Sequence, residues 1–168
     1  MHTPPTPEGA VEVLVEIPRG SRNKYEYDSE RGILRLDRTL YSSVHYPTDY
    51  GFIPETCAED GDELDAMVIV EEATVPGCHV FARPIGVMRM TDDKGIDDKI
   101  ICVPLADPRL AEVHEFSDIA RHWQREIEHF FRIYKELQNL QVEVRGWADS
   151  GVAWEIIEAA RAACRDAG

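Results

Sequence analysis

Cysteine is scarce in this 168-residue sequence, and its few cysteines form no familiar motif. Cys57, Cys78, Cys102 and Cys164 are widely separated, and none belongs to a CxxC pair. This usage fits a cytoplasmic protein with reduced thiols better than a disulfide-rich secreted one. We therefore expect a cytoplasmic location.

Basic residues are also few, and several motifs of membrane and nucleotide binding are missing. The 18 Lys and Arg are outnumbered by 32 Asp and Glu, which gives a formal net charge of −14. This balance argues against a nucleic-acid partner, because contacts to phosphates need clustered positive side chains. No apolar stretch is long enough for a membrane span, and no signal peptide is evident, so we expect no membrane partner. Neither GxxxxGK[ST] nor GxGxxG occurs to hold a nucleotide, and the six histidines lack the HExxH spacing of a zinc site.

The rest of the composition is that of an ordinary globular chain. Hydrophobic residues make up 43% of the sequence and charged residues 30%. The length suits one domain with a substantial core. Residues 1–10, which include three prolines, are expected to form a loose tail, and residues 11–168 to form the domain.

Apolar periodicity predicts several strands followed by helices. The expected strands are Val11–Ile17, the hairpin of Lys24–Tyr27 and Ile33–Arg38, Ala66–Val70, Cys78–Met90 with Pro84 at an edge or bulge, and Ile100–Val103. The stretch His45–Pro54 is interrupted by prolines and should be a constrained loop or an edge strand. Apolar residues from Ile119 to Leu137 recur at helical spacing, with Ser117 as the expected N-cap, and a last helix should begin near Ser150.

One acidic stretch, Asp60-Gly61-Asp62-Glu63-Leu64-Asp65, is the strongest candidate for chemistry. It precedes a buried strand, so its carboxylates would be held on a rigid element and still reach solvent. Asp60, Asp62 and Asp65 can converge only if the chain turns between them, and Gly61 permits such a turn. Close carboxylates repel one another unless a cation lies between them. The stretch is therefore either a metal site or simply an acidic surface loop.

A second acidic loop favours the metal site. The segment Thr91–Lys99 should be a hairpin that brings Asp92 and Asp97 together. Oxygen donors without nearby Cys or paired His suit Mg²⁺ or Mn²⁺, with Ca²⁺ as a competitor. The cationic and phenolic residues that could grip a polyanion are Lys24, Arg38, Tyr50, Lys99, Tyr134 and Lys135. Together these groups suggest metal-assisted phosphoryl transfer.

Several charged and aromatic residues also have a purely structural interpretation. On that interpretation Glu16 is an exposed strand glutamate and Tyr134 is a core residue of the helix. The charged residues of the hairpin, Lys24, Glu26 and Arg38, then form a solvated face. A motif shared with known proteins is needed to choose between the two interpretations.

The acidic stretch resembles the signature of family I soluble inorganic pyrophosphatases, in their short bacterial form. Other segments agree with that family in the same order, and the resemblance runs from about Val11 to Trp147. These segments are Glu16–Pro18, Lys24–Glu26, Asp37–Arg38, Tyr46–Gly51, Arg83–Gly86, Asp92–Lys99 and His129–Lys135.

The resemblance implies a fold, a reaction and an assembly. The implied fold is α+β and mainly β, a closed five-stranded OB-like barrel flanked by two α-helices. The implied reaction is hydrolysis of diphosphate to two phosphates, with several Mg²⁺ ions as cofactors, Mn²⁺ as a substitute and Ca²⁺ as an inhibitor. A homo-oligomer, a hexamer, is also implied.

Matching positions imply roles for individual residues. Glu16, Glu26, Asp60, Asp65, Asp92 and Asp97 would hold metals, and Lys24, Arg38, Tyr50, Lys99, Tyr134 and Lys135 would bind phosphate oxygens. Asp62 would deprotonate the attacking water, a role sometimes placed on Asp97.

The sequence departs from the family pattern at two places. Glu63 stands where many members have proline, and Gln138–Val144 lacks the usual Gly-Lys.

Two other functions stay open. A calcium-binding module without catalysis would need an EF-hand pattern, with glycine at position six and glutamate at position twelve. Counted from Asp60, these positions hold Asp65 and Glu71, so the pattern fails at position six. The second open function is that of a hydrolase acting on another phosphate ester.

Overall fold

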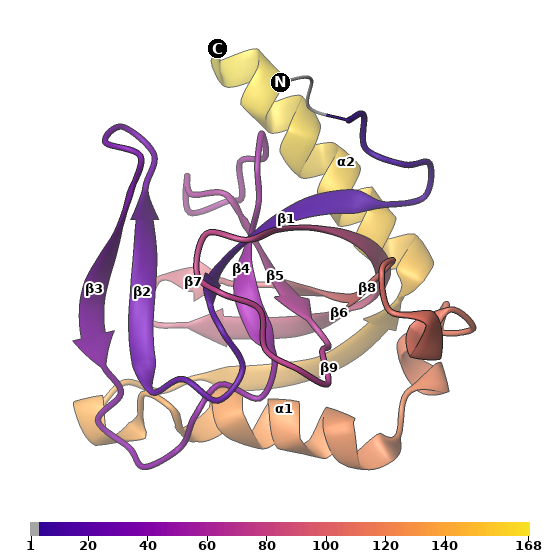
Figure 1. Ribbon diagram of the computed structural model, residues 1–168. Helices are drawn as coiled ribbons and strands as arrows, with labels where there is room; N and C mark the ends of the chain where they lie inside the picture. Colours follow the sequence, from indigo (N-terminus) through magenta and orange to yellow (C-terminus); the bar gives the residue numbers. More distant parts are fainter. Residues whose placement is uncertain (1–3) are drawn as a thin grey trace.

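The computed structural model describes residues 4–168 and is mostly β-structure with two α-helices (Figure 1). Five strands form a ring-like sheet, in which each strand is hydrogen-bonded to two other strands of the ring. Around the ring these strands are β1 (Val11–Ile17), β4 (Asp49–Ile53), β5 (Leu64–Val68), β8 (Lys99–Pro104) and β6 (His79–Asp92). The β1–β6 pairing joins the two ends, and β5–β8 is the parallel pair of the ring. The predicted mainly-β fold with five ring strands and two helices is confirmed.

The stretch around Tyr50 is not an edge strand, as the prolines had suggested. Its core, β4, is fully buried and pairs with both β1 and β5. Gly51 allows this placement, because a Cβ at that position would lie 1.9 Å from the carbonyl oxygen of Leu14 on β1. The prolines flank the strand rather than interrupt it, so the backbone hydrogen bonds of β4 remain available.

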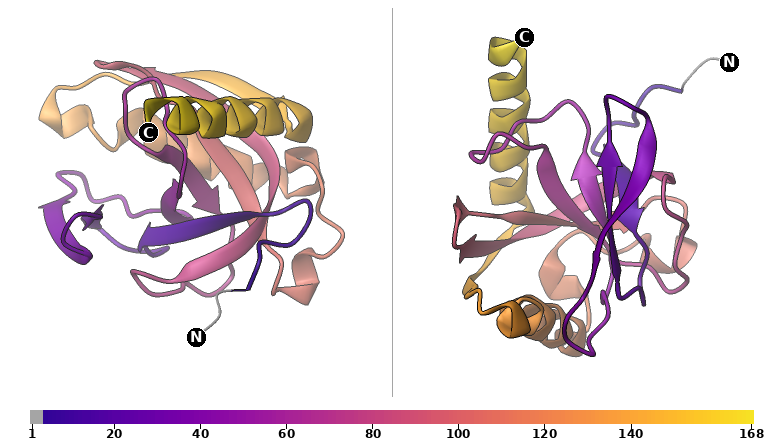
Figure 2. Two further views of the ribbon diagram at one scale, coloured as in Figure 1. Left: turned by 90° about the horizontal axis from the view of Figure 1, so that it is seen from above. Right: turned by 90° about the vertical axis from the view of Figure 1, so that its left-hand side faces the viewer.

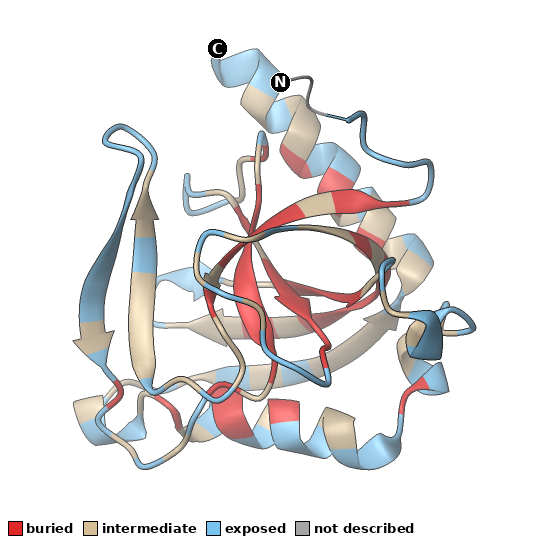
Figure 3. Cartoon of the chain, in the orientation of Figure 1, coloured by how far each residue is buried: buried red, intermediate tan, exposed pale blue. Residues whose placement is uncertain are grey.

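Alternating side chains of the ring strands enter two separate cores. On β8, Ile101 belongs to the core covered by α1 (Arg121–Ile133), whereas Ile100 and Cys102 belong to the core covered by α2 (Ser150–Ala167). Figure 3 shows the buried residues along the ring and on the inner faces of both helices. The period-two pattern of the strands therefore supplies both helix-packing surfaces.

The first helix differs from the sequence prediction at both ends. Ser117 lies in a short 3₁₀ helix, Phe116–Asp118, where the Asp118 carboxylate accepts the backbone N–H groups of His114 and Glu115. The α-helix starts after Ala120 and ends at Ile133, so Leu137 lies beyond it in another 3₁₀ turn, Glu136–Gln138, and is 63% exposed. Ser117 is therefore not its N-cap.

Two further elements lie outside the ring. The hairpin β2 (Asn23–Asp28) and β3 (Ile33–Thr39) is a separate two-stranded sheet that stands beside the ring (Figures 1 and 2). Strand β9 (Glu143–Asp149), which the sequence did not reveal, pairs with β6 and leads into α2. The short β7 (Gly95–Ile96) completes a hairpin with the end of β6, and the bulge predicted near Pro84 is present between Pro84 and Gly86.

The predicted N-terminal tail is only partly described. Residues 4–9 are exposed and lie in no helix or strand, while residues 1–3 fall outside the described part of the chain. Within residues 4–168, no helix has the length and apolar character needed to cross a membrane.

Candidate active site

Lys99 lies at the centre of a buried polar cluster. It is the first residue of β8, and its side chain is 1% exposed. Its ammonium group donates hydrogen bonds to Asp65 at 2.8 Å, to Asp97 at 3.1 Å and to the hydroxyl of Tyr50 at 2.8 Å. The rings of Tyr50 and Phe131 lie within 5.2 Å and 5.4 Å of the same nitrogen. A charge this deeply buried needs such partners to offset its lost hydration.

The two carboxylates of this cluster are perturbed in opposite directions. Burial opposes ionisation of Asp65, but attraction to the Lys99 ammonium and hydrogen bonds with Lys99, Asp97 and Tyr50 together outweigh it and lower the pKa of Asp65. Burial, with repulsion from Asp65, raises the pKa of Asp97 to about 6. Burial alone would lower the pKa of Lys99, but both carboxylates hold it well above its usual value. One ammonium is therefore shared by two carboxylates, so the ionised cluster carries a net negative charge.

Glu16 extends the acidic region from the end of β1. Its carboxylate accepts the backbone N–H of Tyr27 at 2.7 Å, which ties β1 to the outlying hairpin. Burial, aided by repulsion from Asp65 and Glu26, raises the pKa of Glu16 to about 7. A carboxyl group in this state would ionise readily if a cation arrived beside it.

The hairpin brings two of the expected phosphate-binding cations together. Lys24 Nζ pairs with Glu26 at 2.9 Å and with Asp37 at 3.2 Å, and Asp37 also accepts from Arg38 Nε at 2.8 Å. Asp37 thus holds Lys24 and Arg38 side by side, a role that the sequence interpretation missed. The adjacent Asp-Arg pair at 37–38 was the sequence feature from which this role could have been inferred.

Lys135 and Tyr134 reach the site from the end of α1. Lys135 Nζ lies 3.5 Å from Asp92 at the tip of β6, which joins the helix end to the second acidic hairpin. Tyr134 is buried beside Phe130 and Phe131 and also influences the Lys99 ammonium electrostatically. Tyr134 is therefore both a core residue and a neighbour of the charged cluster around Lys99.

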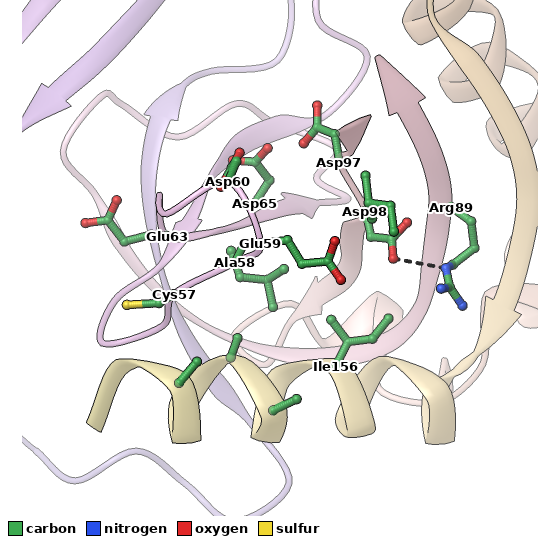
Figure 4. A pocket seen from close by; sticks show the side chains of 15 residues that line it. Cys57, Ala58, Glu59, Asp60, Glu63, Asp65, Arg89, Asp97, Asp98 and Ile156 are labelled. Atoms are coloured by element: carbon green, nitrogen blue, oxygen red, sulfur yellow. Dashed lines mark ion pairs between the residues drawn. The ribbon is translucent and has the colours of Figure 1, made fainter. Parts of the chain in front are cut away.

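The acidic loop that precedes β5 forms the outer rim. Gly61 has φ of +87°, so the turn there uses a conformation that suits glycine, and Asp62 N–H donates to Asp60 Oδ1 at 3.0 Å. Asp60, Asp65 and Asp97 line a pocket of about 380 Å³, one wall of which is α2 (Figure 4). Asp62 is exposed, and its carboxylate makes no hydrogen bond or ion pair with residues 4–168.

The carboxylates are not arranged as a complete metal-coordination site. Among residues 4–168, no three His, Cys, Asp or Glu side chains are arranged to hold an ion. The donor set nevertheless fits hard divalent cations, because it is all oxygen and carries more negative charge than Lys99 balances. Asp60, on the exposed loop, lines the same pocket as Asp65 and Asp97.

Comparison with known proteins places the chain in a family. Residues 13–165 match the family model described as inorganic pyrophosphatase. The chain belongs to this family. It is 51% identical over 150 residues to the inorganic pyrophosphatase of Synechocystis sp., with 89% of each chain covered. It is 48% identical over 158 residues to that of Streptomyces coelicolor, covering 94% of this chain and 97% of the other.

Solved pyrophosphatase structures share the fold. The crystal structure of inorganic pyrophosphatase from Thermus thermophilus superimposes with a TM-score of 0.92 at 40% identity, covering 98% of this chain and 97% of that one. The Helicobacter pylori enzyme gives 0.93 at 37% identity, covering 98% of each chain. The resemblance inferred from the acidic motif is therefore confirmed, and inorganic pyrophosphatases are metal-dependent enzymes.

Proposed function

We propose that this pyrophosphatase-family chain hydrolyses inorganic diphosphate to two phosphates at the carboxylate site around Lys99. The observation that supports this most directly is the Lys99 cluster, in which Asp65, Asp97 and Tyr50 all contact one buried ammonium. Acidic side chains that outnumber their cations can hold divalent metals, and the nearby cations can hold phosphate oxygens.

We assign Mg²⁺ as the natural cofactor, with Mn²⁺ as a substitute. The residues that would hold the ions are Glu16, Glu26, Asp60, Asp65, Asp92 and Asp97. When bound, the metal would supply Lewis-acid activation of water and neutralise charge on the phosphates. Ca²⁺ should inhibit, because its larger and looser coordination shell positions water poorly.

The chain's own side chains would bind diphosphate from two sides. Lys24 and Arg38 approach from the hairpin, and Lys135 and Tyr134 from the end of α1. Lys99 and Tyr50, which are hydrogen-bonded to each other, would stabilise charge that develops on the leaving phosphate. Burial raises the pKa of Tyr50 well above its usual range, so its hydroxyl stays protonated and can donate a hydrogen bond.

We propose Asp62 as the general base, with Asp97 as the competing candidate. The Asp62 carboxylate is free to accept a proton, whereas Asp97 is already hydrogen-bonded to Lys99. Asp62 also lies exposed on a glycine-containing loop, so its carboxylate is accessible to solvent.

The test is phosphate release from diphosphate, compared with release from ATP, in Mg²⁺, in Ca²⁺ and in excess chelator. We expect rapid release from diphosphate in Mg²⁺, little from ATP, inhibition by added Ca²⁺ and loss of activity in chelator. Full activity in chelator, or equal activity on ATP, would contradict the proposal.

We also propose that residues 11–168 are a single domain, that the enzyme is cytoplasmic and that it forms a homo-oligomer, a hexamer. The family match over residues 13–165 supports the first of these. The hexamer rests on the family resemblance, and light scattering that gave a monomer mass would refute it without affecting the catalytic assignment.

A further inference from the structure

Two cysteines that are far apart in the sequence meet beside the acidic loop. The backbone N–H of Cys57 donates to the carbonyl oxygen of Ala160 on α2 at 2.9 Å. Cys164 lies four residues after Ala160, which is one turn further along the same helix face. The backbone contact therefore places Cys57 beside the turn of α2 that carries Cys164, and this neighbouring thiol raises the pKa of Cys57. Figure 4 shows Cys57 next to the α2 ribbon, at the edge of the pocket.

The surroundings of this pair suit covalent chemistry, and those of the other cysteines do not. Cys57 and Cys164 are both partly exposed, so a small reagent can reach them. Cys102 is fully buried in the core under α2, and Cys78 lies before β6 with its sulfur near the carbonyl of His79. Of the four cysteines, only Cys57 and Cys164 combine exposure with a neighbouring thiol.

We propose that Cys57 and Cys164 are an oxidisable dithiol that forms a disulfide with a low-molecular-weight disulfide, such as oxidised glutathione, as the oxidant. One protein thiolate attacks a sulfur of the reagent, which breaks the reagent's S–S bond and releases one thiol. The second protein thiolate then attacks the resulting mixed disulfide and releases the other thiol. Two cysteine thiols are oxidised, one reagent disulfide is reduced to two thiols, and the two cysteine protons end on these released thiols.

The disulfide would join the candidate metal-binding loop to α2. Cys57 lies three residues before Asp60, and the loop folds back on itself through hydrogen bonds from Ala58 N–H to the Asp62 carbonyl at 2.7 Å and from Gly61 N–H to the Ala58 carbonyl at 3.0 Å. A link between Cys57 and Cys164 closes a loop of roughly 100 residues and so restricts the unfolded chain strongly. The oxidised protein should therefore unfold at a higher temperature, whether or not the proposed hydrolysis takes place.

The experiment uses the full chain in its reduced form. The protein is incubated with oxidised glutathione at pH 8, and intact mass, peptide mapping and thermal unfolding are measured before and after reduction. Hydrogen bonding to Cys164 raises the pKa of the Cys57 thiol, so exchange should be faster at pH 8 than at pH 6. Cys57→Ser and Cys164→Ser are the test variants, and Cys78→Ser is the matched control.

We expect a mass loss of about 2 Da, a peptide that joins Cys57 to Cys164, and a rise in unfolding temperature that dithiothreitol reverses. Cys78→Ser should behave like the parent, and each test variant should lose the cross-link and gain a glutathione adduct instead. An adduct without mass loss in the parent protein would overturn the proposal. So would a cross-link that involves Cys78, or one that survives in Cys57→Ser. A cross-link without any rise in unfolding temperature would contradict the expected stabilisation by loop closure.

Discussion

At the scale of single residues, Asp62 and Asp65 share one acidic stretch but differ in their surroundings. Asp65 is hydrogen-bonded to buried Lys99, whereas the Asp62 side chain is exposed. We predict that Asp65→Asn weakens Mg²⁺ binding and recovers part of its activity at high Mg²⁺. Asp62→Asn should keep its metal affinity and lose roughly 10²–10⁴ in turnover, the usual value of a positioned general base. Raising the pH should restore part of that loss.

Metal titration by calorimetry and a pH–rate profile of both variants check this assignment. If Asp62→Asn lost its metals while Asp65→Asn kept them, the two roles would be reversed. If Asp97→Asn alone showed the pH-dependent loss, Asp97 would be the base.

Glu16 provides a second prediction at this scale, based on its pKa of about 7 in the folded chain. The unfolded chain ionises this group near 4.5, so between these values the folded state binds more protons and stability falls as pH rises. The loss of folding stability from ionising Glu16 is absent below pH 4.5 and complete above pH 7. In chelator, Glu16→Gln should therefore stabilise the protein at pH 8 by about 1–3 kcal/mol and do little at pH 4. Thermal unfolding at both pH values measures this, with Glu143→Gln, which is exposed on β9, as the control. Equal effects at the two pH values would contradict it.

At the scale of elements, the contact of β4 with β1 depends on a missing side chain. Gly51→Ala would place a Cβ 1.9 Å from a backbone oxygen that cannot rotate away. We expect a loss of at least about 3 kcal/mol in the free energy of unfolding, at the upper end for overpacked sites. Gly168→Ala, at the C-terminal end of α2, is the control and should change stability little, because the added Cβ would make only an ordinary contact of 3.8 Å with the Cys164 carbonyl oxygen. Denaturant unfolding gives both values, and a near-neutral Gly51→Ala would mean that β1 and β4 can separate without cost.

At the scale of the whole molecule, the formal charge of −14 and the shared ammonium of Lys99 make stability depend on divalent cations. An ion that binds only the folded state adds about 2.7 kcal/mol at a concentration of 100 Kd. Mg²⁺ should therefore raise the unfolding temperature, and chelator should reverse the rise. NaCl at matched ionic strength is the control, because it screens charge without occupying the site. An equal rise in NaCl would refute specific metal binding.

The sequence by itself determined the family, the strand pattern and most of the candidate residues. Alternation in Val11–Ile17 and the four-residue spacing of the helix are local features, so they can be read without neighbours. The acidic stretch is equally local, because its glycine and carboxylates lie within six residues. These signals led to the family resemblance, and the resemblance implied the five-stranded fold with two helices.

Only the tertiary structure decided which groups meet. Asp65, Asp97 and Tyr50 converge on Lys99 because three ring strands lie side by side, and strand pairing is set by contacts far apart along the chain. The same applies to β9, whose partner β6 lies more than one element away, and to Asp37, whose role depends on the register of its hairpin. Cys57 and Cys164 are the clearest case: widely separated in the sequence, they are brought together by the packing of α2 against the loop before β5.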